Sequence, residues 1–481
     1  MLTLYNTFSK TKEEFVSLNP GKVGMYSCGP TVYGFVHIGN IRAYLLSDVV
    51  RRYLEYIGYE VRLIKNITDV GHLTDDDVAQ GDSGEDKMLK AANREKKSPE
   101  EIAKFYEAYF KNIEKEINIL PAQYFPRATA HIPQMIKIIE GLVEKDYAYE
   151  KNGNVFFDVT KFADYGKLSG NTLENLKVGA RLEEHPDKKN PWDFALWLKA
   201  PDGHFMKWPS PWSVGYPGWH IECSAMSTEY LGNTIDIHTG AEDNIFPHHE
   251  AEIAQTQCYT NTKFVKYWLH VRHLLVDGQK MAKSKGTMYR LEDIKEQGYS
   301  PMDLRMLFLS SHYRSRLDFS FESLQQAHKN LQRINDFVLT LETFVLQETN
   351  LKNETSSIAE DYREKFEAAM DDDLNTPLAL SVTYELITQI NKQIDEKTFS
   401  ANDAKKILTL WKKINHVFGF ILAGQAEIPE EIKELIRERE AARAGKDFQK
   451  SDDLRALIEK KGFILEDTKD GMKVKQADSR N

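Results

Sequence analysis

The stretch Gly21-Lys-Val-Gly-Met-Tyr-Ser-Cys-Gly-Pro-Thr-Val-Tyr33 predicts a short strand that ends in a loop of glycine and proline. The next residues, Ile38-Gly-Asn-Ile-Arg-Ala-Tyr-Leu-Leu-Ser-Asp-Val-Val-Arg-Arg-Tyr-Leu54, carry apolar side chains at helical spacing, and Gly58 closes the helix. Residues 61–67 again form a predicted strand. A strand, a loop, a helix and a strand in this order are typical of a doubly wound parallel α/β domain.

The same pattern returns late in the first two thirds of the chain. Residues 234–238 predict a strand, 247–259 a helix and 269–276 another strand. We therefore expect one parallel-sheet domain over residues 1–320, split by an insertion at about 119–200. The acidic residues of 73–98 predict an exposed excursion. From Ser323 the pattern becomes helical, and Asn375-Thr-Pro377 supplies a cap and a first-turn proline for a helix to about Ile390.

Composition narrows the class of protein. The 481 residues include 63 Lys and Arg against 73 Asp and Glu, so the net charge is −10. This balance argues against coating of nucleic acid by bulk charge, although a local basic face remains compatible with it. No apolar run predicts a membrane span, and the N-terminus lacks the pattern of a secretory signal. Three separated cysteines exclude a disulfide scaffold, and we expect a reduced, cytoplasmic setting.

The first motif with chemical meaning is His37-Ile-Gly-Asn40, at the start of the predicted helix. A helix N-terminus presents free N–H groups and partial positive charge to a phosphate, and Gly39 permits close approach. The motif alone also fits an ordinary capping loop.

The second motif, Gln279-Lys280-Met-Ala-Lys283-Ser-Lys-Gly286, places three lysines in six residues between two glycines. Such a loop can close over a triphosphate and stabilise a pyrophosphate leaving group. It also fits a solvated basic turn, and its pairing with the first motif favours phosphate binding.

The third pattern consists of separated metal-binding residue types: Cys28, Cys223, His248 and Glu252. His248 and Glu252 share one helix face, and with two thiolates they suit tetrahedral zinc. Each residue alone also fits a buried core position. His249 and Glu250 could supply ligands instead. The spacing is not that of a His-Glu-x-x-His metalloprotease.

Four ordered motifs together resemble class I cysteinyl-tRNA synthetases. They are Cys28-Gly-Pro-Thr-Val-Tyr-Gly-Phe-Val-His37-Ile-Gly-Asn40, Gly218-Trp-His-Ile-Glu-Cys223-Ser-Ala-Met, Phe246-Pro-His-His-Glu-Ala-Glu252-Ile-Ala-Gln and Lys280-Met-Ala-Lys-Ser284. The resemblance runs almost end to end. It implies a Rossmann-like, doubly wound catalytic domain over 1–320 with an inserted connective subdomain. A helical tRNA-binding bundle at 321–425 and a small anticodon-binding region at 426–481 would follow.

The resemblance also implies roles for individual residues. His37, Asn40, Lys280 and Lys283 match catalytic positions, and His37, Gly39, Asn40, Asp243 and Lys283 match ATP-binding positions. Trp219 and Thr68 fall on the site for substrate cysteine, and Cys28, Cys223, His248 and Glu252 fall on ligands of a single zinc ion. Arg437, Arg439, Arg443, Lys446 and Lys450 are the expected tRNA contacts. Ala282 and Lys285 depart from the usual lysine loop.

The implied partners are L-cysteine, ATP with Mg²⁺ and tRNA(Cys), with no membrane, and the chain is expected to be a monomer. One alternative is a ligase that joins cysteine to an amino sugar on the same adenylating domain. The roughly 160 residues after Ser320 argue against it, because a small acceptor needs no long helical extension. Retention of both lysines and all four metal-binding residues argues against a catalytically silent RNA-binding paralogue. A zinc hydrolase leaves the lysine loop unexplained.

Overall fold

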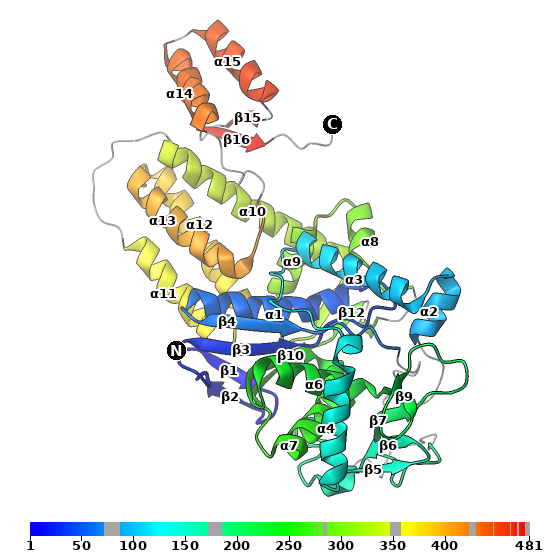
Figure 1. Cartoon of the computed structure of the whole chain (residues 1–481). Coiled ribbons are helices and arrows are strands. Elements are labelled where there is room, and N and C mark those ends of the chain that lie inside the picture. Colours follow the sequence, from blue (N-terminus) through cyan, green and yellow to red (C-terminus); the bar gives the residue numbers. More distant parts are fainter. Residues whose placement is uncertain are drawn as a thin grey trace. The chain divides into compact units, whose positions relative to one another are not determined.

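The structure is a computed structural model that describes residues 1–71, 87–171, 185–276, 278–281, 286–346, 357–422, 430–445, 447–461, 463–468 and 471–476 (Figure 1). The chain divides into two compact units. The first comprises Met1–Pro301, Ser311–Ser320 and Asp371–Asn375, and the second comprises Met302–Ser310, Phe321–Met370 and Thr376–Asn481.

A four-stranded parallel sheet forms the centre of the first unit, in the order β11-β10-β3-β4 (Figure 1). Its strands are β3 (Lys22–Ser27), β4 (Glu60–Lys65), β10 (Ile235–Ala241) and β11 (Val265–Val271). Helix α1 (Ile38–Tyr56) connects β3 to β4, and α7 (Glu250–Thr260) connects β10 to β11. This arrangement confirms the predicted α/β class and its parallel sheet.

The sheet reverses direction of growth at β3, because β4 pairs with one of its edges and β10 with the other. In sheets of this kind, ligands bind beyond the carboxyl ends of the strands at that reversal. Buried Met25 and Tyr26 of β3 lie in register with Ile237 and His238 of β10. The geometry of this pair therefore decides where a site can form.

The strand predicted at 269–276 is wrong as a single element. The structure has β11 and a separate strand, β12 (Leu274–Val276), which pairs with β13 (Gln279–Lys280) and β14 (Leu317–Phe319). The backbone leaves the first sheet between them because Arg272 N donates to Tyr313 O and His273 N donates to Glu242 Oε2. These bonds replace the continued pairing that a longer β11 would need.

An inserted segment separates the two halves of the central sheet. It contains α2 (Lys87–Glu95), α3 (Pro99–Glu116), η1 (Ala128–His131), α4 (Ile132–Glu144) and η2 (Val159–Lys161). The segment also contains an antiparallel sheet with the strand order β5-β6-β7-β9-β8. Its strands are β5 (Ala148–Lys151), β6 (Asn154–Phe157), β7 (Phe194–Lys199), β8 (Trp208–Pro209) and β9 (Val214–Pro217). Strand β9 leads directly into α6 (Trp219–Leu231).

The exposed excursion expected at 73–98 is wrong in its second half. Residues 72–86 lie outside the described ranges, but α2 buries Met88, Ala91 and Ala92 and packs beside α3. Their i, i+3, i+4 spacing forms an apolar face in an otherwise charged stretch. The remaining elements of this unit are β1 (Thr3–Asn6), β2 (Thr11–Glu14), η3 (Glu242–Asn244), η4 (Ile245–His249) and α8 (Leu291–Glu296).

The second unit is helical, as predicted from residue 323 onward. It contains α9 (Pro301–Leu309), α10 (Phe321–Leu346), α11 (Ile358–Asp371), α12 (Thr376–Asp395) and α13 (Ala401–Phe418), whose core includes fully buried Trp411, Phe366 and Phe418. Helices α14 (Glu430–Ala444) and α15 (Phe448–Lys460) and the hairpin β15 (Phe463–Thr468) and β16 (Gly471–Gln476) share a small core of Ile432, Ile436, Ile458, Phe463 and Leu465. In the described part of the chain, no helix has the length and apolar character to cross a bilayer.

The close packing at the junction between the inserted sheet and α6 can be tested by substitution. A Cβ atom at Gly218 would overlap the carbonyl oxygen of Ala195, which is backbone and cannot move aside. We expect Gly218→Ala to lower the free energy of unfolding by about 3 kcal/mol, measured by denaturant titration. Gly24→Ala is the matched control, because its Cβ would make ordinary contacts at 3.6 and 3.7 Å. Equal stability of the two variants would contradict the described junction.

Candidate active site and metal centre

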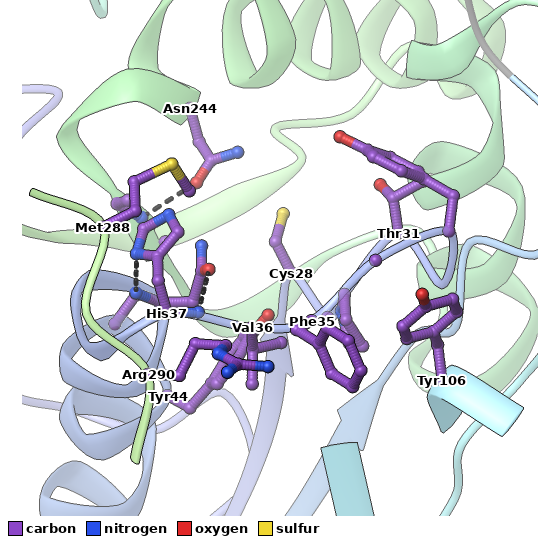
Figure 2. Close-up of a pocket in the computed structure, with 18 of the residues that line it drawn as sticks. Cys28, Thr31, Phe35, Val36, His37, Tyr44, Tyr106, Asn244, Met288 and Arg290 are labelled. Carbon is purple, nitrogen blue, oxygen red and sulfur yellow. Dashed lines mark hydrogen bonds between the residues drawn. The ribbon is translucent and has the colours of Figure 1, made fainter. Parts of the chain in front are cut away.

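A pocket of about 910 Å³ opens at the carboxyl ends of β3 and β10 (Figure 2). Ser27 and Cys28 line it from the end of β3, and Gly240 and Ala241 line it from β10. Cys28 N donates to Thr239 O, which holds the two strand ends together. Trp219 adds a wall from the start of α6. The pocket therefore lies where the reversal of the sheet places a ligand site.

His37 and Asn40 line this pocket and cap α1 reciprocally. His37 Nδ1 accepts from Gly39 N at 3.2 Å and Asn40 N at 3.4 Å, while Asn40 Oδ1 accepts from His37 N at 3.1 Å. Burial lowers the pKa of His37, and nearby Asp243 partly opposes that shift. Because Nδ1 accepts, the neutral ring carries its proton on Nε2 and can donate it to a bound oxygen.

The four residues predicted as metal ligands come together from three segments. One donor atom each from Cys28, Cys223, His248 and Glu252 lies within 4.8 Å of all the others. Metal–ligand bonds of about 2.0–2.3 Å place the ligands of tetrahedral zinc about 3.3–3.8 Å apart. The donor chemistry and spacing of this set therefore fit such an ion. Cys28 belongs both to this cluster and to the wall of the pocket.

A second set with the same spacing contains Cys28, His238, His249 and Glu252. Cys28 Sγ lies 3.2 Å from His249 Nε2, so the sequence-based alternative of His249 remains geometrically open. Neither set found among the described residues includes Glu250, whose Oε2 accepts from Ser169 N at 2.9 Å. The carboxylate of Glu250 is therefore committed to a loop of the inserted segment.

The buried charges of the cluster depend on one another. Burial alone would raise the pKa of Glu252, but His238 and His248 lower it to about 2. Burial alone would lower the pKa of His248, but Cys223 and Glu252 raise it to about 10. The hydrogen bond that the Cys223 thiol donates to Cys28, together with burial, raises the pKa of Cys223 well above its usual value. A bound dication would reverse the shift at the thiols, because it stabilises thiolate directly.

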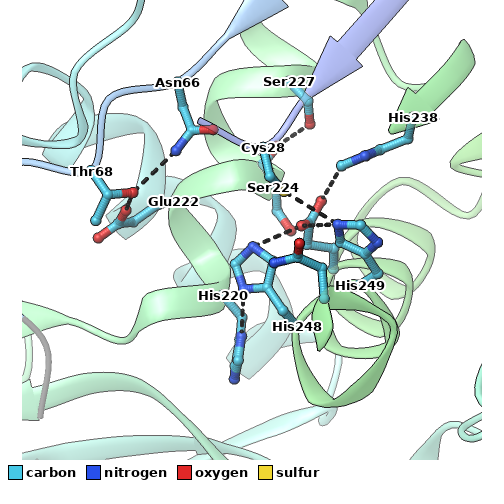
Figure 3. Close-up of polar contacts among 12 residues, drawn as sticks. Cys28, Asn66, Thr68, His220, Glu222, Ser224, Ser227, His238, His248 and His249 are labelled. Carbon is cyan, nitrogen blue, oxygen red and sulfur yellow. Dashed lines mark hydrogen bonds and ion pairs between the residues drawn. The ribbon is translucent and has the colours of Figure 1, made fainter. Parts of the chain in front are cut away.

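Histidines surround the cluster (Figure 3). His238 Nε2 lies 2.9 Å from Glu252 Oε2, and the Nδ1 atoms of His220 and His248 lie 2.9 Å apart. His249 Nδ1 lies 2.7 Å from His270 Nε2. Sequence reasoning missed His220, His238 and His270. For His238 and His270 the available signal was a histidine within each of two buried, parallel strands, β10 and β11.

Known protein families and relatives match nearly the whole chain. A family model for the catalytic domain of class I (C) tRNA synthetases matches residues 14–329, and a DALR domain model matches residues 365–423. A cysteine–tRNA ligase of Lachnoclostridium phytofermentans is 43% identical, with 99% of this chain and 100% of that protein covered. One from Chlorobium chlorochromatii is 43% identical, with 98% of each covered. The chain belongs to the cysteine–tRNA ligase family.

A solved structure shares the fold of this ligase family at low identity. Mycobacterium tuberculosis methionyl-tRNA synthetase in complex with methionyl-adenylate has a TM-score of 0.59 and 12% identity, covering 83% of this chain and 90% of that one. At this identity the likeness shows the class I architecture, in agreement with the resemblance inferred from the sequence.

Thr68 belongs to a buried chain of hydrogen bonds that connects the two cysteine segments of this family member (Figure 3). Gly29 N donates to Asn66 Oδ1 at 2.8 Å, and Asn66 Nδ2 donates to Thr68 Oγ1 at 3.0 Å. Thr68 Oγ1 then donates to Glu222 Oε2 at 2.8 Å. Because Gly29 follows Cys28 and Glu222 precedes Cys223, this series of hydrogen bonds holds both thiols in place. The residue Asn66 was not found by sequence reasoning.

Other predicted residues lie at the edge of the site. Asp243 Oδ2 lies 3.4 Å from His273 Nδ1, and Asp243 is not among the described pocket-lining residues. Lys280 pairs through its backbone with Leu275 in β12, while residues 282–285, which include Lys283, lie outside the described residues. A Cβ at Gly39 would overlap Met281 Cε, so the lysine segment begins beside the start of α1.

The residues predicted to contact tRNA differ in their exposure to solvent. Arg437 and Arg443 of α14 and Lys450 of α15 are exposed, whereas Arg439 is 2% exposed. Lys446 lies outside the described residues. A buried guanidinium cannot reach a phosphate, and we therefore leave Arg439 out of the surface proposed for RNA.

The hydrogen-bond chain through Asn66 generates a prediction. Asn66→Ala would leave Gly29 N without its buried acceptor, so we expect the free energy of unfolding to fall by about 2–3 kcal/mol in denaturant titration. Asn112→Ala is the control, because Asn112 is exposed on α3 and pairs only with Glu116 of its own helix among the described contacts. A loss no greater than that of the control would contradict the role of Asn66.

Proposed function

We propose that this chain activates L-cysteine with ATP and transfers the cysteinyl group to tRNA(Cys). The observation that carries the proposal is that Cys28 belongs to a two-thiol, imidazole and carboxylate cluster and also lines a pocket containing the start of α1. A thiol-selective site and a phosphate-binding site therefore meet in one cavity. Membership of the family and coverage of its relatives over nearly their whole length support this activity.

The first step forms a mixed anhydride. The substrate carboxylate attacks the α-phosphorus of ATP, the bond from that phosphorus to the bridging oxygen breaks, and pyrophosphate leaves. No protein nucleophile is required, because positioning and charge stabilisation lower the barrier. The N-terminus of α1 and the Nε2 proton of His37 would stabilise phosphoryl oxygens. Lys280, Lys283 and Mg²⁺ would balance the charge of the leaving group.

The second step transfers the acyl group. A hydroxyl of the terminal ribose of tRNA attacks the carbonyl carbon of the adenylate, loses its proton and displaces AMP. The exposed Arg437, Arg443 and Lys450 are proposed to contact the RNA backbone within the C-terminal region, 426–481. The helical region 321–425 is proposed to bind the same RNA. The cytoplasm is the proposed location of this two-step reaction, because tRNA is aminoacylated there.

The metal proposed for the cluster is a single zinc ion held by Cys28, Cys223, His248 and Glu252. When bound, it would supply a ligand site that favours a thiolate over a hydroxyl, so cysteine is selected and serine rejected. Coordination discriminates more strongly than a pocket that senses size alone. Trp219 would close the substrate side, since its ring centroid lies 4.4 Å from that of His248. The hydrogen bonds of Thr68 to Asn66 and Glu222 would hold the two cysteine segments together.

The function is tested by cysteine-dependent exchange of pyrophosphate into ATP, followed by acceptor assays with tRNA(Cys) and with glucosaminyl-inositol. We expect exchange and transfer to tRNA alone. Lys283→Ala should slow exchange by about 100-fold, because one donor to the transition state is lost, while metal content stays unchanged. Absence of exchange would remove every cysteine ligase from consideration, and transfer to the amino sugar would establish the alternative.

The metal assignment has its own test in elemental analysis and chelator competition. Cys223→Ser replaces a soft thiolate by a hydroxyl, and we expect zinc affinity to fall by about 100-fold or more. Cys258→Ser is the matched control, since Cys258 is also a buried thiol but belongs to neither donor set. Equal zinc content in both variants would show that the ligand set is wrong.

A further inference from the structure

A cluster of aromatic side chains borders the pocket, and two of its members, Phe35 and Tyr106, line it. This aromatic rim consists of Phe35, Phe105, Tyr106 and Tyr109. The ring of Phe35 makes edge contacts with Phe105, Tyr106 and Tyr109 at centroid distances of 6.2, 5.0 and 4.8 Å. Phe35 and Phe105 nevertheless remain 42% and 46% exposed. Phe35 lines the cavity and Phe105 packs against Phe35, and two partly exposed phenyl rings beside a cavity indicate a surface that a ligand covers.

Cationic side chains accompany these rings. The guanidinium of Arg290 lies 5.0 Å from the centroid of Phe35, and Lys97 Nζ lies 4.7 Å from that of Phe105. Arg94 lines the pocket with Tyr106 and keeps 55% of its side chain exposed beside its ion pair with Glu95. Aromatic faces bordered by cations are the combination that binds single-stranded nucleic acid, through base stacking and phosphate contact.

The rim is separate from the side of the pocket that suits the phosphates of ATP. Figure 2 shows Phe35 and Tyr106 on one side of Cys28, and His37, Asn244 and Met288 on the other. The reaction requires a second nucleotide, because the terminal ribose of the RNA must reach the adenylate between these two sides. That nucleotide needs a base site of its own.

We propose that the aromatic rim binds the base of the 3′-terminal nucleotide of tRNA by stacking on Phe35, with Phe105 beside it and Arg290 and Arg94 facing the RNA backbone. The inference rests on the proposed function and locates its acceptor substrate. Stacking on Phe35 could equally bind the adenine of ATP. The experiment therefore distinguishes the base of the RNA from the adenine of ATP.

The experiment compares binding of complete tRNA(Cys) with that of the same transcript lacking its 3′-terminal nucleotide. For the unaltered protein we expect the complete RNA to bind about tenfold more tightly. Phe35→Ala should abolish this ratio, Phe105→Ala should reduce it, and Phe35→Trp should retain it because a stacking face remains. Phe205→Ala is the control, since Phe205 is 78% exposed in the loop between β7 and β8 and should leave the ratio intact. A general loss of stability lowers both affinities and does not change their ratio.

The inference is overturned if the ratio in Phe35→Ala and Phe105→Ala equals that of the unaltered protein. A higher KM for ATP in pyrophosphate exchange by these two variants would then assign the rim to the adenine of ATP. Failure of the proposed function is recognised separately, because the unaltered protein would then show no cysteine-dependent exchange.

Discussion

Parallel pairing between β3 and β10 is the constraint on which the site depends. Their register places Ser27 opposite Thr239, so Cys28 leaves β3 beside Gly240, which continues in β10. Gly240 has no alternative, because a Cβ there would lie 2.5 Å from His249 Cε1. A slip of this register by one residue would reverse the faces of the strand and remove Cys28 from the cluster. The pocket and the metal-binding residues thus have a common origin in one pair of strands.

Burial gives the cluster both its cost and its chemistry. Cys223, His248 and Glu252 are almost fully buried, and Glu252 is held between two histidines. Charges in such an environment are tolerated only when they are paired or coordinate a cation. His220 contacts His248 and His238 contacts Glu252, and outer contacts of this kind usually orient metal ligands. The proposed zinc site would recognise a substrate thiol as a ligand rather than by its size.

The pocket also has two differently built sides. The capped start of α1 offers N–H groups and a neutral histidine, which suit phosphate, whereas the aromatic rim offers exposed rings beside cations. Cys28 lies between them. An enzyme that must bring both ATP and an RNA end to the carboxyl group of one amino acid requires such a division, because each partner is recognised by a different interaction.

Local pattern was sufficient for the helices and for the choice of residue types. The apolar spacing of α1 and α10 and the His37–Asn40 cap depend on neighbours within one element. The i, i+4 pair of His248 and Glu252 joins the adjacent η4 and α7, so short-range physics decides it as well. Tertiary structure alone decided the break between β11 and β12, the burial of α2 and of Arg439, and the chain from Gly29 through Asn66 and Thr68 to Glu222. It also brought His238 beside Cys28 and His270 beside His249, and it left Glu250 outside both donor sets. These outcomes rest on contacts between residues far apart in the chain, which no local periodicity encodes.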